Sequence, residues 1–501
     1  MLLPGECRSS GRYRSRRPTV IMSRADKRKE RGMTTRDAGV EELTSLWARF
    51  GAELTYHDLP ESVRRTVRSI TLDTLATSIA ANTLGIGIPE LLAWARHAGG
   101  VEEASLIGLP DRLPAAVAAM LNGGMAHALN FDDTTAVGSG HLGPVTHPTA
   151  LVAAELRGGA SGKEFMTALA AGMELMSRIG IAITATQGAF TESRPQPTQM
   201  PGCFAAAMSA SRMLGFSPQE THSALGLAFM QASGGRQPVL EGRPAKAIYA
   251  AFSCQAGMQS MLLAREGLLG DCDAFEGAAG FFPTYYGGVF HRPAMSDGLG
   301  EEWRLLNVGI KPWPTTGVAH VFIEAASNLR ATRVPDPSAV THVLLRGEPH
   351  IRTFCEPLQT RRNPQAPVEA EDSIIFATTR ALTTGNVTLA DLQPTPQGLF
   401  EETCLRIANV TEYEVDESLG KSGVVQVTLA GGETLSERVD AAPGHRDNPL
   451  TDEQRHQKFR ACAVHAGTLL SDATINEVID MTEHLDDVPD VTDFLRLLRG
   501  G

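Results

Sequence analysis

The segment between Asn122 and Thr149 holds the densest group of side chains able to exchange protons. A run rich in alanine is followed by polar residues that include Asn130, Asp132, Asp133, Thr134 and His147. The end of a helix would deliver these groups into loops, where reactive side chains on a rigid scaffold are often found. The alternative is that the two aspartates cap a helix and that the histidine is buried and hydrogen-bonded.

A second polar group surrounds Lys246, which opens the apolar run AKAIYAAF and follows Arg236 and Arg243 in a polar loop. Removing a proton beside a carboxylate needs a base near the C–H and a cation facing the developing charge. His147 suits the acid or base because its unperturbed pKa lies near neutrality. Lys246 would hold a carboxylate or carry a second proton. Alternatively, the arginines are surface residues and Lys246 extends its ammonium group from a buried helix to the surface.

The charge and the cysteines of the chain exclude several partners and cofactors. The 501 residues carry a formal net charge of -12, which gives no general attraction to nucleic acid or an anionic membrane. An anionic substrate would therefore need a local cluster of cations. Separately, no segment of the sequence is predicted to be long and apolar enough to cross a bilayer. Seven scattered cysteines without a CxxC pair suit neither a disulfide framework nor an iron–sulfur cluster. Without HExxH, a Walker loop or a strand-linked GxGxxG, we expect no metal and no cofactor.

The first residues differ from the rest of the chain. Residues 1–36 are rich in arginine, lysine and serine and have little apolar content to bury, which predicts a disordered basic tail. An upstream start is one explanation, since Met22 or Met33 could begin the folded protein, and organellar import is another. A cytoplasmic location is the default expectation.

Hydrophobic spacing divides the remainder. Residues 37–305 repeat apolar residues at helical spacing, with Ser161 and Glu164 as a capping box before one run. Residues 306–446 add the strand-like segments THVLLRG, NVTEYEV and SGVVQVTLAGGETLSERV, the last with Gly431-Gly432 as a hairpin turn. Residues 447–501 return to helical spacing and are expected to rejoin the first domain. The fold class is mainly α plus α+β: a large all-helical domain with a smaller α/β domain.

Several motifs in this order resemble those of the MmgE/PrpD family, which includes 2-methylcitrate dehydratases, cis-aconitate decarboxylases and iminodisuccinate epimerases. The segment from Asn122 to Thr134 with Thr146-His-Pro-Thr149 is similar to the family's NG...AHALDFDDTH...HPS signature. Further matches are GMELMSR, GCFAAAMSASRMLG, Lys246, KPWP with His320, and PGHRDNPL. The resemblance implies a homodimeric lyase or isomerase without a metal, acting on a small di- or tricarboxylic acid between the helical domain and an α/β lid.

The resemblance also assigns residues. Catalytic roles are expected for His147, Lys246, Asp132 and Asp133, and substrate-binding roles for Asn130, Thr134, Gln196 and Thr316. A binding role is also expected for Arg243, because it lies near Lys246 in the sequence and adds positive charge. Three of these depart from the family pattern: Asn130 replaces an acid, Gln196 a histidine, and Thr316 the histidine of decarboxylase-like members. Asparagine takes no proton at neutral pH and glutamine lacks imidazole chemistry, so the substrate or the proton route is expected to differ.

Three functions remain open from the sequence. The first is a hydro-lyase resembling 2-methylcitrate dehydratase, acting by general acid–base proton abstraction. The second is a cis-aconitate-like decarboxylase or an epimerase of a related polycarboxylate, because these reactions share a carbanion-like intermediate. The third is a carboxylate-binding family member without catalytic activity.

Overall fold

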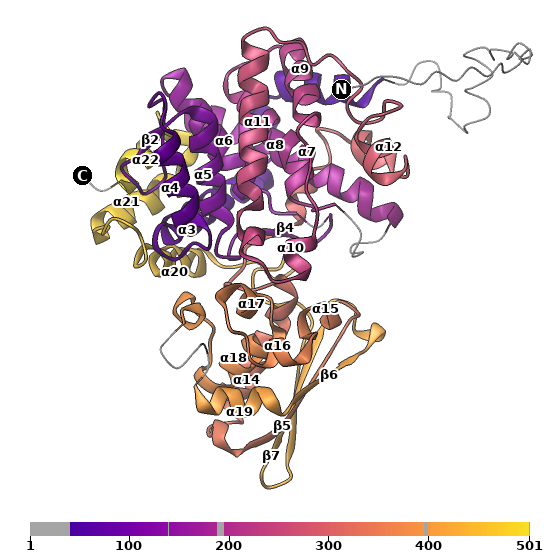
Figure 1. Cartoon of the computed structure of the whole chain (residues 1–501), viewed down its shortest axis with the longest axis vertical. Helices are drawn as coiled ribbons and strands as arrows, with labels where there is room; N and C mark the ends of the chain where they lie inside the picture. Colours follow the sequence, from indigo (N-terminus) through magenta and orange to yellow (C-terminus); the bar gives the residue numbers. More distant parts are fainter. Residues whose placement is uncertain (1–40, 139, 188–194, 395–398, 400, 500–501) are drawn as a thin grey trace, which may run out of the picture. The chain divides into compact units, whose positions relative to one another are not determined.

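The structure is a computed structural model that describes residues 41–138, 140–187, 195–394, 399 and 401–499. The basic tail predicted at residues 1–36 lies outside the described residues. From Glu42 onward the chain forms one compact unit. It is mainly helical with a smaller α/β part, which confirms the predicted fold class (Figure 1).

The first part of the chain is a bundle of helices around one hydrophobic core. Its longer helices are α2 (Leu43–Glu53), α3 (Glu61–Leu84), α4 (Ile88–Ala98), α5 (Ala115–His127), α6 (Gly143–Arg157), α7 (Gly162–Gln187), α8 (Gln199–Met213), α9 (Pro218–Phe229) and α11 (Tyr249–Arg265). Shorter helices are α10 (Gln237–Leu240), α12 (Phe281–Tyr286) and α13 (Arg292–Ser296), with 3-10 turns at η1 (Tyr56–Asp58), η2 (Pro244–Ile248) and η3 (Arg304–Asn307). Alanine and glycine at the helix contacts let α5, α8 and α11 pack closely.

Two local predictions in this part can be compared with the structure. The capping box before α7 is present: Glu164 N donates to Ser161 Oγ over 3.4 Å, and Ser161 N donates to Glu164 Oε2 over 3.0 Å. The prediction that no segment is long and apolar enough for a membrane is wrong for α7, whose residues Gly162–Thr186 meet that length and composition. However, 94% of its apolar window is buried inside the protein, as expected for a central core helix.

Two short antiparallel pairs connect parts of the chain. Strands β1 (Ala104–Ser105) and β2 (Arg112–Leu113) form one, and β3 (Thr134–Thr135) with β4 (Val308–Gly309) forms the other. Thr134 is paired with Gly309, so the loop after α5 is tied to the segment that enters the α/β part.

The α/β part, which we call the lid, has its own core and a four-stranded sheet in the order β6-β5-β7-β8. Strand β5 (Val340–Gly347) runs parallel to β6 (Thr411–Val415) and antiparallel to β7 (Gly423–Leu429), which pairs antiparallel with β8 (Thr434–Val439). These strands confirm the segments predicted from alternation, and Gly432, at φ 84°, lies in the predicted hairpin turn.

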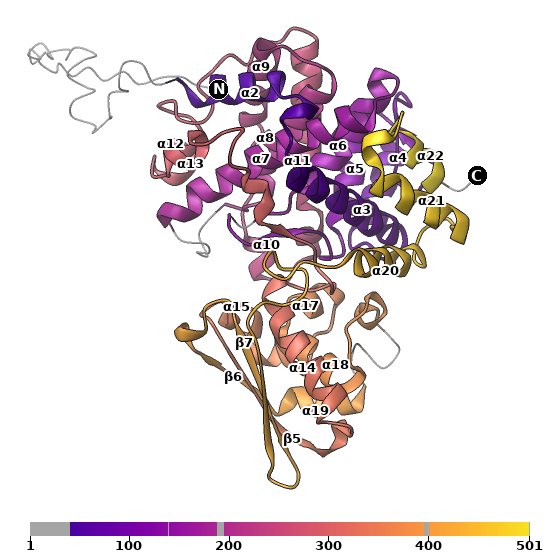
Figure 2. The same cartoon turned by 180° about the vertical axis from the view of Figure 1, so that it is seen from behind.

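Helices cover one face of this sheet (Figure 2). They are α14 (His320–Thr332), α18 (Ile374–Thr384) and α19 (Glu402–Asn409), and the short helices α15 (Ile351–Cys355), α16 (Leu358–Arg362) and α17 (Pro367–Glu371) lie between β5 and α18 in sequence. The 3-10 turns are η4 (Gly317–Ala319), η5 (Pro337–Ala339), η6 (Leu389–Leu392) and η7 (Glu417–Leu419).

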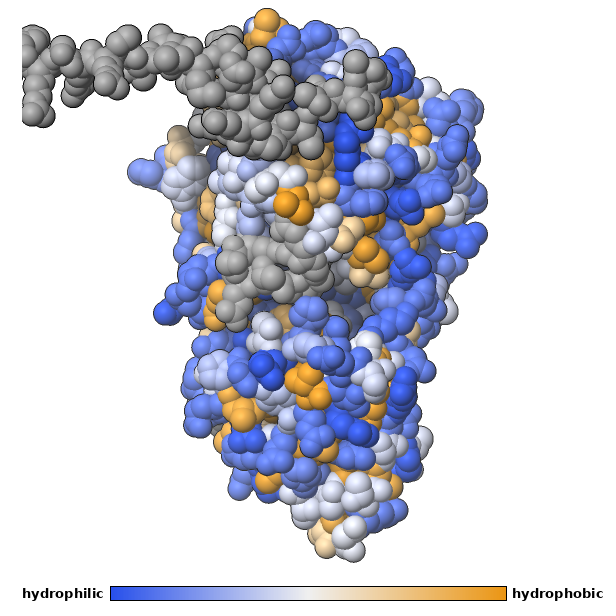
Figure 3. Space-filling model, turned by 90° about the vertical axis from the view of Figure 1, so that its right-hand side faces the viewer, coloured by the Kyte–Doolittle hydropathy of each residue, from blue (hydrophilic) through white to orange (hydrophobic). Residues whose placement is uncertain are grey.

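The last helices belong to the helical part. After the sheet, α20 (Asp452–Ala463), α21 (Asp472–Glu483), η8 (Leu485–Asp487) and α22 (Asp493–Leu498) follow, and α20 and α21 pack against α3 (Figure 1). Phe459, Val478 and Phe494 are buried in the core of the bundle. The described surface on the face drawn in Figure 3 is mainly hydrophilic, with hydrophobic residues in small groups.

Candidate functional site

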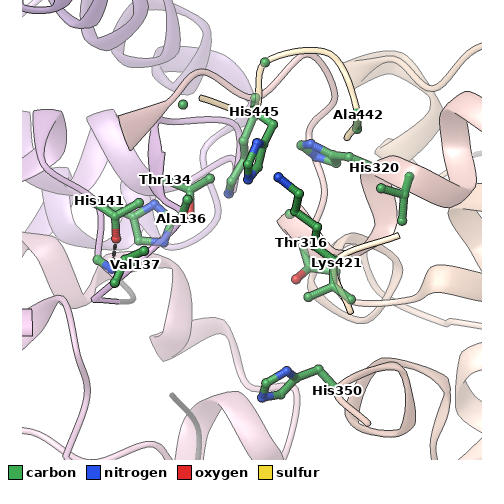
Figure 4. A pocket seen from close by; sticks show the side chains of 18 of the residues that line it. Thr134, Ala136, Val137, His141, Thr316, His320, His350, Lys421, Ala442 and His445 are labelled. Carbon is green, nitrogen blue, oxygen red and sulfur yellow. Dashed lines mark hydrogen bonds between the residues drawn. The ribbon is translucent and has the colours of Figure 1, made fainter. Parts of the chain in front are cut away.

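A cavity of about 750 Å³ is lined by residues of both the helical part and the lid. The helical part contributes the loop after α5, the end of α7, the loop before α8 and the turn η2, whereas the lid contributes its entrance, β5 and the segment after β8. Figure 4 shows His141 and Thr134 on one side and Thr316, His320 and Lys421 on the other. Of the nine predicted site residues, five line this cavity: Asn130, Thr134, Gln196, Lys246 and Thr316.

Asn130 connects two buried lysines at the polar end of this cavity. Its backbone lies in the left-handed region at φ 49°, which asparagine adopts more readily than most residues. Lys311 Nζ donates to the backbone oxygen of Asn130 over 2.9 Å and to its Oδ1 over 2.7 Å. Asn130 Nδ2 in turn donates to Asp372 Oδ1 over 3.3 Å, and Lys246 Nζ donates to the same oxygen over 2.7 Å.

The two lysines are held in opposite electrostatic environments. Burial lowers the pKa of Lys246, but Asp372 and Glu371, whose Oε2 lies 3.6 Å from Nζ, outweigh burial and raise it. Burial dominates at Lys311 and lowers its pKa. Lys246 therefore keeps its proton and its positive charge, whereas the ammonium group of Lys311 loses its proton more readily than an exposed lysine does.

Asp132 and two histidines form a buried cluster beside the cavity. Asp132 Oδ2 lies 2.7 Å from His127 Nδ1 and 3.0 Å from His141 Nδ1, and Lys311 Nζ lies 4.0 Å from Oδ1. Burial alone would raise the pKa of Asp132, but these three neighbours outweigh it and hold the pKa well below its usual range. Asp132 is thus an ionised carboxylate.

His141 is the residue of this cluster that lines the cavity. Its Nδ1 also lies 2.5 Å from the backbone oxygen of Asp133. Because two acceptor oxygens face Nδ1, the proton of the neutral ring belongs on that nitrogen and Nε2 is the basic one. An oriented imidazole with a carboxylate behind it is the arrangement of a general acid or base.

Asp133 binds backbone N–H groups at the start of α6. Its two carboxylate oxygens accept hydrogen bonds from Leu142 N and Gly143 N, each over 2.7 Å, at the first residues of α6. Burial, with Asp132 adding to it, raises the pKa of Asp133 to about 7. The carboxylate holds the loop that presents His141, and it does not line the cavity.

The structure does not bring His147 or Arg243 to the cavity. His147 lies inside α6, fully buried, with Nε2 2.8 Å from Thr71 Oγ1 and its ring against Phe165. Burial lowers its pKa to about 3, so the ring is neutral. Arg243 is exposed and pairs with Glu241. The catalytic role predicted for His147 and the binding role predicted for Arg243 therefore do not fit this geometry. A histidine packed in the core and an arginine in a surface loop can have the same local sequence pattern as residues of a functional site.

The remaining predicted residues frame the cavity. Gln196 accepts from Thr198 N over 2.7 Å through Oε1, which orients its amide group. Thr316 N donates to the backbone oxygen of Glu371 over 2.8 Å. A Cβ added to Gly317 would lie 3.8 Å from the Thr134 methyl group, so the lid loop approaches Thr134 closely.

Sequence reasoning named no site role for His141, Lys311 or His320, all of which line the cavity. His320 is buried, its Nε2 has no hydrogen-bond partner among the described residues, and burial lowers its pKa to about 3. Figure 4 shows its ring directed toward Lys421 and His445. A signal existed for two of them, since Lys311 and His320 stand in one of the recognised motifs.

His127, Asp132 and His141 could also hold a metal ion, because one ligand atom from each lies within 4.8 Å of the others. Asp132 Oδ2 is already hydrogen-bonded to His127 Nδ1 and lies 3.0 Å from His141 Nδ1, and the ammonium group of Lys311 supplies positive charge beside the carboxylate. This arrangement fits proton exchange better than cation binding.

Comparison with known families matches two successive domains of one family. Residues 46–292 match the MmgE/PrpD N-terminal domain and residues 313–483 match the MmgE/PrpD C-terminal domain. The boundary between the matched ranges lies where the chain enters the lid.

Similar curated proteins include several cis-aconitate decarboxylases. The chain is 27% identical to the cis-aconitate decarboxylase-like protein oryM of Aspergillus oryzae, over 93% of this chain and 100% of that protein. It is 26% identical to the cis-aconitate decarboxylase of Homo sapiens, over 78% of this chain and 81% of the relative. It is 23% identical to the cis-aconitate decarboxylase of Aspergillus terreus, over 91% of this chain and 96% of the relative.

Proposed function

Because the chain belongs to the MmgE/PrpD family, we propose that it is a lyase that acts on a small polycarboxylate by proton transfer at a carbon next to a carboxylate. The observation that carries the proposal is the pairing of His141 with Asp132 in a cavity that also contains Lys246 and Lys311. The decarboxylases among its relatives support carboxy-lyase chemistry in particular.

The cations of the cavity provide the binding energy for such a substrate. Lys246, Lys311 and Arg236 line the same cavity, and all three are buried. Buried cations interact more strongly with a carboxylate than exposed ones because less water screens them. Lys246 holds a substrate carboxylate, and its pair with Asp372 keeps the ammonium group in place before the substrate binds.

His141 carries the proton. In decarboxylation, the bond between a substrate carbon and its carboxylate breaks and CO₂ leaves. The electron pair of the broken bond stays on the substrate carbon and is delocalised toward a conjugated carboxylate that faces the lysines. The imidazolium of His141 then donates a proton from Nε2 to that carbon, and Asp132 stabilises the imidazolium.

A dehydration would use the same groups in a different order. Nε2 of His141 would take the C–H proton, and the hydroxyl group would leave as water after receiving a proton from an acid. The neutral amide groups of Asn130 and Gln196 line the cavity and orient substrate oxygens without exchanging protons. Their presence supports a substrate or a proton route different from that of relatives with an acid and a histidine there.

The test is to incubate the purified protein with 2-methylcitrate, citrate, cis-aconitate and iminodisuccinate in heavy water and follow products by proton NMR. Loss of a carboxyl carbon with one deuterium added identifies decarboxylation, a new alkene signal identifies elimination, and deuterium uptake with inversion identifies epimerisation. Absence of product and of deuterium exchange with the whole panel would contradict the proposal for these substrates.

A further inference from the structure

A second cavity, of about 530 Å³, lies in the helical part, where β2, the end of α6 and α22 come together (Figure 1). Among the described residues, none lines both this cavity and the first one. The 15 residues of α6 make a helix about 22 Å long, with the loop of His141 at its start and the second cavity at its end. Most side chains that line the second cavity are polar or charged, namely Ser105, Arg112, Glu155, Thr492, Arg496 and Arg499.

The carboxylate that lines this cavity, Glu155, is matched by residues of β1 and β2. Ser105 N donates to Glu155 Oε2 over 2.7 Å, and Ser105 Oγ donates to Oε1 over 2.6 Å. Arg112 Nη1 donates to the same Oε1 over 2.9 Å, and its Nη2 donates to the backbone oxygen of Glu103 over 2.7 Å. The negative charge of Glu155 is therefore balanced by one of the three arginines in the lining, which leaves the other two.

The other two arginines come from the end of the chain. Arg496 of α22 and Arg499, directly after this helix, are three residues apart and lie on one face. Arg496 Nη1 lies 2.9 Å from Asp493 Oδ1, and 73% of the Arg496 side chain is exposed. Arg499 is partly buried, and its Nε and Nη2 are buried without a hydrogen-bond partner among the described residues. Arg499 therefore has charged donors that no acceptor in the described part of the chain satisfies.

The environment of Arg499 disfavours its positive charge. Burial and the neighbouring Arg112 lower the pKa of Arg499, and Glu155 offsets only part of this effect. The guanidinium group nevertheless keeps its proton at neutral pH, because the pKa of arginine is far above 7. A buried charged donor without an acceptor destabilises the folded state, and a bound anion would remove that penalty.

We propose that the second cavity is a binding site for a phosphate group, carried by inorganic phosphate or by a small phosphate monoester, with Arg499 as its main cation. Arg112 belongs to β2, whereas Arg496 and Arg499 belong to the end of the chain, so donors line the cavity from two sides. A tetrahedral phosphate accepts hydrogen bonds from several directions, whereas a planar carboxylate is matched by a single guanidinium group. A Cβ added to Gly158 would meet no atom within 4 Å, so the end of α6 leaves room for the anion.

The experiment titrates the purified full chain with inorganic phosphate and with glycerol 3-phosphate by calorimetry. Arg499→Met removes the donors and should raise Kd for both probes by about tenfold to a hundredfold, as expected for the loss of a hydrogen bond to a charged group. Arg499→Lys keeps the charge without the planar guanidinium group, so its Kd should lie between those of the parent and Arg499→Met. Arg265→Met replaces an arginine that is exposed outside both cavities and should bind phosphate as the parent does.

The first cavity also contains cations, so Lys246→Met distinguishes the two sites. This variant removes a cation from the first cavity and should leave Kd for phosphate within about twofold of the parent. Saturating phosphate should raise Tm in the parent and in Lys246→Met, and should have a much smaller effect on Arg499→Met. Arg496→Met replaces the more exposed arginine and should raise Kd by less than Arg499→Met does.

The outcomes concern the second cavity alone, because none of them requires turnover of a polycarboxylate. Tighter binding of glycerol 3-phosphate than of inorganic phosphate identifies a phosphate monoester as the ligand, and equal affinities identify free phosphate; both support the site. Absence of binding and of a Tm shift at about 10 mM phosphate overturns the proposal. Binding that Lys246→Met abolishes and Arg499→Met leaves unchanged belongs to the first cavity and also overturns it. Succinate that binds through Arg499 as tightly as phosphate overturns the choice of phosphate.

Discussion

At the scale of residues, His141 and His147 differ in what surrounds them. His147 precedes a proline and matches the expected motif, but it occupies the interior of α6, where α3 and α7 bury it. His141 lies in the loop before α6, held by Asp132 and Asp133. The burial of a helix face depends on its neighbours in space, so the local sequence does not distinguish His147, buried in the core, from a histidine that lines the cavity.

Lys246 and Arg243 provide a matched pair of cations near one turn. Lys246→Met removes a buried cation that faces the cavity, so kcat/KM should fall by about 10²–10³-fold, as when one stabilising donor of a transition state is lost. Arg243→Met changes an exposed side chain and should stay within about twofold of the parent. Steady-state kinetics check both variants, and equal losses in the two would contradict the role of Lys246.

The cluster of His127, Asp132 and His141 predicts the response to metal removal. Since Asp132 is hydrogen-bonded to His127 and lies close to His141, and Lys311 supplies the neighbouring charge, prolonged dialysis against a strong chelator should leave kcat/KM unchanged. Metal content is measured beside activity in each sample. Loss of activity that one added divalent ion restores would show that the cluster is a metal site.

At the scale of elements, α20 holds two segments of the site together. Lys458 Nζ donates to the backbone oxygens of Phe131 over 2.7 Å and of Lys311 over 2.8 Å, and it pairs with Asp73 of α3. Its ammonium group also lies 3.9 Å from the centre of the Phe131 ring. Lys458 therefore fixes the backbone next to Asn130 and at Lys311 from outside the cavity lining.

Replacing this lysine should be costly. Lys458→Met leaves Asp73 buried without its cation and should lower the free energy of unfolding by about 3–5 kcal/mol. Arg460→Met, on the same helix but exposed, should change it by less than about 0.5 kcal/mol. Urea unfolding compares the two, and a similar small change in both would show that the buried contacts of Lys458 contribute little.

At the scale of the whole molecule, two buried carboxyl groups make stability depend on pH. Burial raises the pKa of Asp133 and of Glu371 to about 7, above about 4 for exposed carboxyl groups. The folded state therefore binds more protons than the unfolded state between these values. This contribution is complete below pH of about 4 and is lost as the pH rises through about 7.

Glu371→Gln should remove one of these groups. The fall in Tm between a pH of about 5 and about 7 should be smaller in this variant than in the parent, and Asp133 should maintain part of it. Glu301→Gln, at an exposed position, serves as the control. Differential scanning calorimetry gives the change of Tm with pH in the variant and in the parent. A change as large in the variant as in the parent would contradict the claim that buried Glu371 contributes to the pH dependence.

Much of the architecture follows from periodicity in the sequence. The helical spacing, the β5 to β8 segments and the hairpin at Gly432 are local patterns, and each forms the structure that it predicts. The site depends on contacts between residues far apart, such as Lys246 with Asp372 and Lys311 with Asn130. Asp372 carries no motif of its own, so its place beside Lys246 emerges only when the lid is folded against the bundle.

The most direct test of the central claim compares two histidine variants. His141→Asn and His147→Gln are incubated in heavy water with the polycarboxylate that the parent converts, and deuterium at the reacting carbon is measured by NMR. Loss of the proton carrier in His141→Asn should slow deuterium transfer by about 10²–10⁴-fold. His147→Gln should retain turnover within about tenfold once its folded fraction is matched, because its ring contacts Thr71 rather than the cavity. The reverse order of the two variants would contradict the account of this site.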